Sequence, residues 1–329
     1  MGAEHQIAYF LRELAGADPE RRTAAAKGLG RIGRPEHATA LVAVADDPEP
    51  GVRAAVAQGL GRLGARETGG VVVKLLDDAD PQVRRRASLA VLRLGLDGRP
   101  VTEVFARLLR DPDRHVRINA LVGLDAFGVP GDVVALVELL GDPDDQVWGR
   151  ASSLVHRFAR DHAVRAEVIR AAREGEGAAR ARALEMVPAD CAVRLLDSLL
   201  TGLRDPSPQV RTAVTRRLLN ADAATAADSL AAALEDERDP GVAAYLLSGL
   251  GGRGDERATD PAVRWLSDPV AGPWAARALG GIGTPAAAEH LRTALDDPAL
   301  PDRTRAAAAV AVGEVGGWDA VWQLLPYVD

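Results

Sequence analysis

Asp-Pro dipeptides recur along this chain of 329 residues at nearly even intervals. Nine of them begin at residues 18, 47, 80, 111, 142, 205, 239, 268 and 297, and a tenth at residue 260 falls outside this series. Most intervals are close to 31 residues, and the single interval of 63 residues equals two periods with a missing dipeptide near Glu174. The chain therefore counts as ten units, and self-similarity at a period of this length predicts a solenoid of stacked repeats.

Unit three indicates what each unit encodes. Asp80 and Pro81 suit the start of a helix, because an Asp side chain accepts hydrogen bonds from free N–H groups and Pro is tolerated in a first turn. Gly95 suits the end of that helix, since Gly readily adopts the left-handed conformation. Apolar residues recur between them every three or four positions, which predicts a helix over 81–94. An earlier apolar run predicts a first helix over 67–76, so each unit is expected to be a helical hairpin.

Neither helix of such a hairpin can bury its apolar face alone, so neighbouring hairpins must stack around one continuous core. The composition agrees, with 47% hydrophobic but only 4% aromatic residues, as suits thin helices packed through small side chains. We predict an all-α protein, a right-handed α-α superhelical solenoid of about ten hairpins plus a C-terminal half-repeat, as one array over 1–329. A degenerate unit over 161–189 is a candidate hinge between sub-arrays 1–160 and 190–329.

Both ends of the array carry signs of capping, which a terminal repeat needs because it has a neighbour on one side only. Unit one has Arg21 where other units have a valine expected to be buried. The tail is expected to close the core with the side chains of Trp318, Trp322, Leu325 and Tyr327.

The charge and cysteine content exclude several classes of function. A formal net charge of −7 disfavours general binding of nucleic acid, which needs a basic surface, although it leaves room for a local arginine patch. Cys191 is the only cysteine, so the chain can form no disulfide within itself and no cysteine zinc cluster. The opening residues lack a signal peptide, and no stretch reaches the roughly 18 apolar residues of a membrane span. We therefore expect a cytoplasmic protein without membrane contact.

The openings of the second helices resemble those of HEAT repeats, in particular the short HEAT-like repeats named after phycobiliprotein lyases. The closing Gly-Leu-Gly-x-Ile/Leu-Gly segments at 28–33 and 59–64 add to this resemblance. The openings that carry it are Asp47-Pro48 with Val52-Arg53, Asp80-Pro81 with Val83-Arg84, Asp111-Pro112 with Val116-Arg117, and Asp205-Pro206 with Val210-Arg211.

The resemblance implies that the aspartates and arginines form a ladder between successive units and that the second helices line the concave face. A half-buried Arg needs a carboxylate partner, and its planar guanidinium can bind both oxygens of that carboxylate. The arginines expected to act structurally in this way are Arg22, Arg53, Arg84, Arg117, Arg211 and Arg305. Unit five departs from the pattern with Trp148 and unit eight with Ala243, each at the arginine position.

The leading prediction for function is a non-catalytic scaffold that binds a partner protein or peptide on its concave face. An apolar strip on units three to five is expected to be exposed there, and such patches mark contact surfaces. The candidate partner-binding residues are Arg85, Leu89, Leu92, Ile118, Leu121, Val122, Trp148, Ser153 and Arg216.

The alternative is an enzyme, or an enzyme's accessory subunit of lyase-like or biosynthetic type, that acts on a small or peptidic molecule in the same groove. His156 and Asp125 are then the residues to test, because a His beside a carboxylate is the usual start of acid–base catalysis. No recognisable catalytic set supports this alternative, and no cofactor is expected. No metal is expected either, since the Glu-His pairs lie on first helices and cannot converge; these pairs are Glu4-His5, Glu36-His37 and Glu289-His290.

Overall fold

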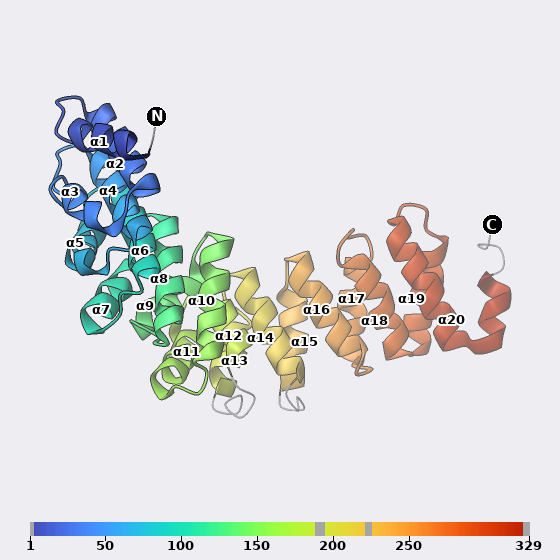
Figure 1. The fold of residues 1–329 in the computed structure, drawn as a ribbon. Coiled ribbons are helices and arrows are strands. Elements are labelled where there is room, and N and C mark those ends of the chain that lie inside the picture. Colours follow the sequence, from blue (N-terminus) through green and yellow to red (C-terminus); the bar gives the residue numbers. More distant parts are fainter. Residues whose placement is uncertain (1–2, 188–194, 221–225, 325–329) are drawn as a thin grey trace. The chain divides into compact units, whose positions relative to one another are not determined.

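The computed structural model describes residues 3–187, 195–220 and 226–324, and for 315–324 it describes the backbone alone. The described residues form twenty α-helices and contain no strand (Figure 1). The helices follow one another as ten hairpins, which confirms the predicted all-α repeat architecture. We call the odd-numbered helices the first helices and the even-numbered ones the second helices.

The chain divides into two compact parts, each made of several repeats. We call them the N-terminal unit, which ends at Glu167, and the C-terminal unit, which begins at Val168; the boundary lies within α11 (His162–Glu174). The N-terminal unit contains α1 (Ala3–Glu13), α2 (Pro19–Ile32), α3 (Ala38–Val42), α4 (Pro50–Leu63), α5 (Gly69–Lys74), α6 (Pro81–Leu94), α7 (Arg99–Leu108), α8 (Arg114–Phe127), α9 (Val133–Glu138) and α10 (Asp145–Arg157). The C-terminal unit contains α12 (Gly177–Met186), α13 (Leu196–Gly202), α14 (Pro208–Asn220), α15 (Ala227–Asp236), α16 (Pro240–Gly251), α17 (Thr259–Trp265), α18 (Gly272–Ile282), α19 (Pro285–Asp296) and α20 (Asp302–Leu324).

Helix α6 begins and ends where the sequence predicts. The Asp80 side chain accepts hydrogen bonds from the N–H groups of Gln82 at 2.7 Å and Val83 at 3.4 Å, and Gly95 has a φ of 59°. The first helix of the same unit is less regular than predicted. Helix α5 has only six residues, and 3-10 turns flank it at Arg66–Thr68 and Leu75–Asp77.

Within each unit the second helices contact one another in chain order and form one layer, which the first helices cover on one side. The valines that precede Arg53, Arg84 and Arg117 are buried in this layer, with 0% exposure at Val52, Val83 and Val116. The opposite side of the layer, which no first helix covers, we call the second-helix face. The second helices carry the candidate binding residues that the sequence suggested.

Glycine allows the second helices to approach closely. A Cβ atom added at Gly30 would lie 2.5 Å from the Cα atom of Gly59, and one added at Gly61 would lie 2.8 Å from the Cα atom of Ala90. The Gly-Leu-Gly-x-Ile/Leu-Gly segments therefore act as contact points between α2, α4 and α6.

The two ends of the chain differ in how far the structure tests them. Arg21 is exposed and lies 3.5 Å from Asp18 and 3.8 Å from Glu13, where the equivalent valines of other repeats are buried. At the other end α20 continues to Leu324. The part of the predicted C-terminal half-repeat that the structure describes is therefore the end of α20 and forms no separate helix. The side chains of Trp318 and Trp322, and all of Leu325, Tyr327 and Cys191, lie outside the described residues.

Candidate interaction surface

A ladder arginine, in the repeats that carry one, links two successive hairpins. The Arg53 guanidinium donates to the two carboxylate oxygens of Asp78 at 2.7 and 2.8 Å. It also donates to the carbonyl oxygens of Asp47 at 2.8 Å and Pro48 at 3.1 Å, in the loop before its own helix. Asp78 in turn accepts a hydrogen bond from the N–H of Asp80 at 2.9 Å. One arginine thus joins the loop of its own unit to the loop of the next.

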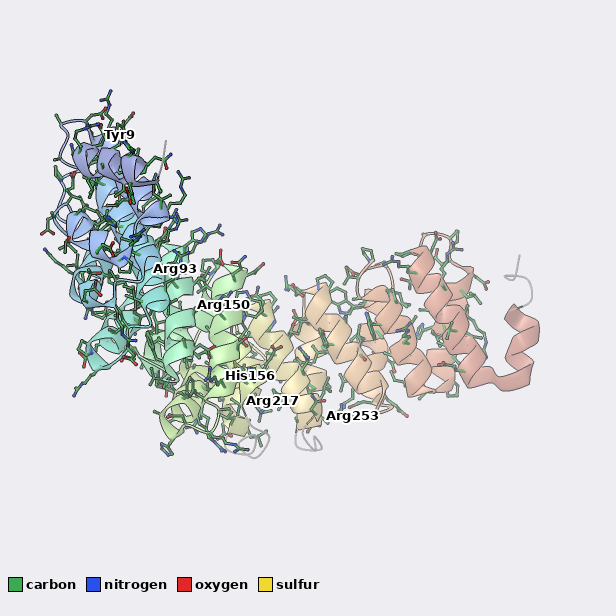
Figure 2. The ribbon with its side chains drawn as sticks, in the orientation of Figure 1. Tyr9, Arg93, Arg150, His156, Arg217 and Arg253 are labelled. Carbon is green, nitrogen blue, oxygen red and sulfur yellow. The ribbon has the colours of Figure 1, made fainter. Side chains whose placement is uncertain are left out.

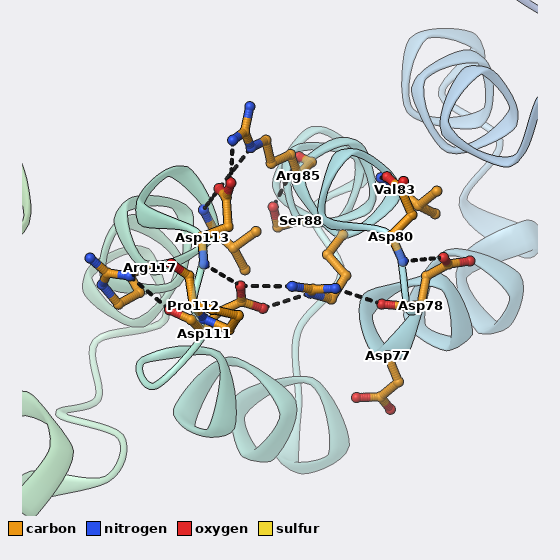
Figure 3. A network of polar contacts seen from close by, with 12 residues as sticks. Asp77, Asp78, Asp80, Val83, Arg85, Ser88, Asp111, Pro112, Asp113 and Arg117 are labelled. Atoms are coloured by element: carbon orange, nitrogen blue, oxygen red, sulfur yellow. Dashed lines mark hydrogen bonds and ion pairs between the residues drawn. The ribbon is translucent and has the colours of Figure 1, made fainter. Parts of the chain in front are cut away.

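This arrangement recurs along both units, and Figure 3 shows the section between Asp78 and Arg117. The pairs are Arg22–Asp47, Arg53–Asp78, Arg84–Asp111, Arg117–Asp142, Arg180–Asp205 and Arg211–Glu237. The structural role predicted for Arg22, Arg53, Arg84, Arg117 and Arg211 is therefore confirmed, whereas the guanidinium of Arg305 contacts Asp302 of its own helix. Two details correct the prediction. The ladder residue of unit three is Asp78, since Asp80 caps α6, and the degenerate unit contributes Arg180.

The electrostatics of the ladder favour the charged forms of both partners. The Arg22 guanidinium lowers the pKa of the Asp47 carboxyl, although burial opposes this. At Asp78 burial raises the pKa, but Arg53 and the N–H of Asp80 together hold it below its ordinary value. Because these charges satisfy one another, the ladder supports the fold and offers no free group to a ligand.

The polar candidates on the second-helix face also make internal contacts. Arg85 forms a two-pronged ion pair with Asp113, and this pair lowers the pKa of Asp113 to about 2. The Trp148 ring N–H donates to Asp145 at 3.1 Å, and the Ser153 hydroxyl donates to the carbonyl of Gly149 at 2.9 Å.

Arg216 belongs to the C-terminal unit. Its guanidinium lies 2.8 Å from Glu185 and stands 5.9 Å from the centre of the Tyr245 ring. Arg216 on α14 thus links α12 and α16 within the C-terminal unit.

Four of the five residues of the predicted apolar strip are partly exposed, and one is not. Leu89 and Leu92 on α6 and Ile118 and Val122 on α8 are half-buried, and these four residues are the apolar strip from here on. Leu121 is only 2% exposed and belongs to the core, so its predicted place on the surface is wrong.

The equivalent residue of the preceding repeat, Ser88, indicates why Leu121 is buried. The side chain of Asn119 on α8 donates to the hydroxyl of Ser88 on α6 at 2.8 Å, which shows the two helices in side-by-side contact at this level. Ser88 holds the same repeat position as Leu121 and is likewise 0% exposed. This position faces the adjacent second helix, which covers it.

The two residues singled out for catalysis do not pair with each other in the structure. The Asp125 carboxylate pairs with Arg157, which also donates to the Asp125 carbonyl at 3.0 Å. The Nδ1 atom of the exposed His156 lies 2.9 Å from the carbonyl oxygen of Ser152. In the part of the chain that the structure describes, no group of three or more His, Cys, Asp or Glu side chains could hold a metal ion.

A family model for HEAT repeats matches residues 7–93, 71–156 and 227–313, which together cover well over half of the chain. The chain belongs to the HEAT-repeat family. Solved structures agree on the fold: Kap121p matches with a TM-score of 0.61 at 12% identity, Kap95p with 0.57 at 15%, and importin beta with 0.52 at 14%.

These alignments cover 98%, 98% and 95% of this HEAT-repeat chain but only 43%, 54% and 46% of the respective matched chains. The chain thus spans about half the length of these structures or less, and at such identities the likeness concerns the fold alone. Among curated protein sequences none matches the chain significantly. Within the described residues no helix has both the length and the apolar character needed to cross a membrane.

Proposed function

We propose that this HEAT-repeat protein is a non-catalytic scaffold that binds a partner protein or peptide on the second-helix face of α6, α8 and α10. The observation that carries the proposal is the apolar strip of Leu89, Leu92, Ile118 and Val122. These residues come from two adjacent helices, and no first helix covers them. Contiguous apolar side chains on a layer otherwise lined by polar groups are typical of a protein contact surface.

Polar residues around the strip fit the rim of such an interface. Arg150, Ser153 and His156 on α10 are exposed, and Trp148 is half-buried beside them in the sequence. Figure 2 labels Arg150 and His156 on this helix. Aromatic and arginine side chains are enriched at protein interfaces, so Trp148 and Arg150 are the rim residues we expect to contribute most.

Two further statements belong to this proposal. The period of about 31 residues supports repeats of the short phycobiliprotein-lyase type within the HEAT family. A chain with a single cysteine suits a reducing compartment, so we place the protein and its partner in the cytoplasm. One solved relative, Kap95p, is described with bound RanGDP, and we extend from it only the general use of such a solenoid as a protein-binding surface.

The experiment compares proteins captured from a lysate of the source organism by three baits: the wild type, Leu89→Asp/Val122→Asp and Leu11→Asp/Val134→Asp. The last variant is a matched control, because Leu11 and Val134 are exposed apolar residues on first helices, at 37% and 40% exposure. Circular dichroism first establishes that all three baits fold. We expect a protein that the wild type and the control retain and the strip variant loses. Equal capture by all three baits would contradict the proposal.

A further inference from the structure

Three arginines at equivalent positions of successive units have no carboxylate partner. Arg31, Arg62 and Arg93 are exposed and lie in the last turns of α2, α4 and α6, with 31 residues from each to the next. No ion pair or hydrogen bond joins their side chains to any residue in the part of the chain that the structure describes. We call these three residues the arginine row, and Figure 2 labels Arg93.

The row runs along helices that touch near these ends. The contacts of Gly30 with Gly59 and of Gly61 with Ala90 bring the C-terminal halves of α2, α4 and α6 together. Helices in contact lie about 8–10 Å apart, so successive arginines of the row are spaced by roughly that distance. The three side chains therefore form a line across the helices rather than three isolated charges.

The surroundings of the row are basic, in a protein whose net charge is −7. Helices α4 and α6 contain no acidic residue, and the only one in α2 is Glu20 in its first turn. Lys27 and Arg86, also exposed, add positive charge to the same helices. In the loops at this end Glu36 and Asp97 lie near other arginines, Arg34 at 3.8 Å and Arg66 at 3.7 Å, and the exposed Glu67 is the remaining acidic residue of these loops.

Helix stabilisation alone does not account for the row. A basic residue in a last turn does complement the negative end of the helix dipole. Helices α8, α16 and α18 nevertheless form without any basic residue in their last turn. Other exposed cations of the N-terminal unit do bond to carboxylates of the preceding hairpin, as Lys74 does to Asp46 and Arg107 to Asp77. In α2, α4 and α6 the equivalent last-turn cations are instead unpaired among the described residues in three successive repeats.

We propose that the arginine row binds an extended acidic segment of the partner protein. An extended chain in the polyproline II conformation has three residues per turn and rises about 3.1 Å per residue, so carboxylates at every third residue lie on one side, repeat at about 9 Å and match the spacing of the row. Arginine favours carboxylates because its fork binds both oxygens. Single-stranded nucleic acid fits less well, since α2, α4 and α6 contain no aromatic residue on which bases could stack. The inference rests on the proposed function, because it names the chemistry of a partner on the same face.

The test measures fluorescence anisotropy with a labelled peptide of five Glu-Ser-Gly repeats. The same peptide with Gln for Glu and a thymidine oligonucleotide of similar charge serve as comparison probes. The protein variants are Arg31→Ala/Arg62→Ala/Arg93→Ala and, as a control of equal charge, Arg12→Ala/Lys74→Ala/Arg107→Ala on the first helices α1, α5 and α7. We expect the wild type and the control to bind the Glu peptide with an affinity that falls as salt is raised. The row variant is expected to bind it about tenfold more weakly or worse.

Three results would overturn the inference: no binding of the Glu peptide at low salt, equal losses in both triple variants, or tighter binding of the oligonucleotide than of the Glu peptide. The peptide carries no apolar side chain and does not test the apolar strip. A protein lost from the strip variant in the lysate experiment therefore stands whatever the peptide does. If the Glu peptide binds as expected but the strip variant loses no protein in the lysate experiment, only the proposed function is contradicted.

Discussion

At the scale of single residues, the structure separates charges that hold hairpins together from charges that are free for other uses. The side chains of Arg53 and Asp78 are only 17% and 9% exposed, and each meets several partners. Arg107 and Asp77, one position before Asp78, form an ion pair in which both side chains are about 60% exposed. Removing one partner from a mostly buried pair leaves an uncompensated charge, whereas an exposed pair contributes little.

Asp77 and Asp78 therefore provide a matched test of the ladder. We expect Asp78→Asn to lower the free energy of unfolding of the N-terminal unit by about 2–4 kcal/mol at neutral pH. Asp77→Asn should change it by less than about 1 kcal/mol. Urea denaturation followed by circular dichroism measures both. Equal effects of the two substitutions would show that the ladder is no more than a set of surface ion pairs.

The pH dependence of the same variant has a definite sign. The pKa of Asp78 is lowered in the folded protein, so its stabilising contribution is complete above the ordinary Asp pKa of about 4. It is lost as the pH falls through the lowered pKa. The difference in stability between the wild type and Asp78→Asn should therefore shrink on acidification below about pH 4. A difference that stays constant would contradict the assignment of Asp78 as a charged ladder residue.

At the scale of helices, close contact between neighbouring second helices explains the glycine motif that the sequence repeats near the ends of α2 and α4. A Cβ at Gly61 would lie 2.8 Å from both the Cα and the Cβ of Ala90, and the backbone of α6 cannot easily yield. Gly149 in α10 also lies inside a second helix, but a Cβ there would meet nothing within 4 Å. The two glycines have the same helical environment and different neighbours.

Substituting these glycines by alanine should change stability in opposite directions. Gly149→Ala should raise the stability of the unit by up to about 1 kcal/mol, because alanine is the better helix former. Gly61→Ala gains the same propensity but forces α4 and α6 apart, and overpacking of this kind costs about 1–3 kcal/mol. Urea midpoints of the two variants measure the effects. Stabilisation by both would show that the contact between α4 and α6 is looser than described.

The sequence predicted the helices better than their contacts with one another. Repeat spacing and end signals were enough to predict α6 at 81–94, because those signals are local. The exposure of Leu121 was predicted wrongly because the adjacent second helix covers this position, and the periodicity of one helix carries no information about its neighbour. Arg180 was missed for lack of an Asp-Pro signal. It lies 25 residues before Asp205, as Arg22 lies 25 before Asp47, and that interval could have revealed it.

At the scale of the whole molecule, the repeat architecture was predictable and the partner was not. Ten hairpins follow from the spacing of the Asp-Pro dipeptides, because each hairpin needs its neighbours to bury its apolar face. Membership of the HEAT-repeat family follows from the same features and from the family match. A repeat fold specifies a surface rather than a chemistry, so function must be argued from the side chains that the fold leaves uncovered. In the N-terminal unit these are the apolar strip and the arginine row.

Site-specific photo-crosslinking tests the central claim most directly. A photoreactive amino acid is placed at Leu92 in the apolar strip or, as a control, at Val134 on the first-helix side, and each protein is irradiated in a lysate of the source organism. We predict one discrete protein adduct from position 92 that position 134 does not give and that an excess of unlabelled wild-type protein competes away. Adducts that are the same from both positions, or that the wild type does not compete, would contradict a binding surface on the second-helix face.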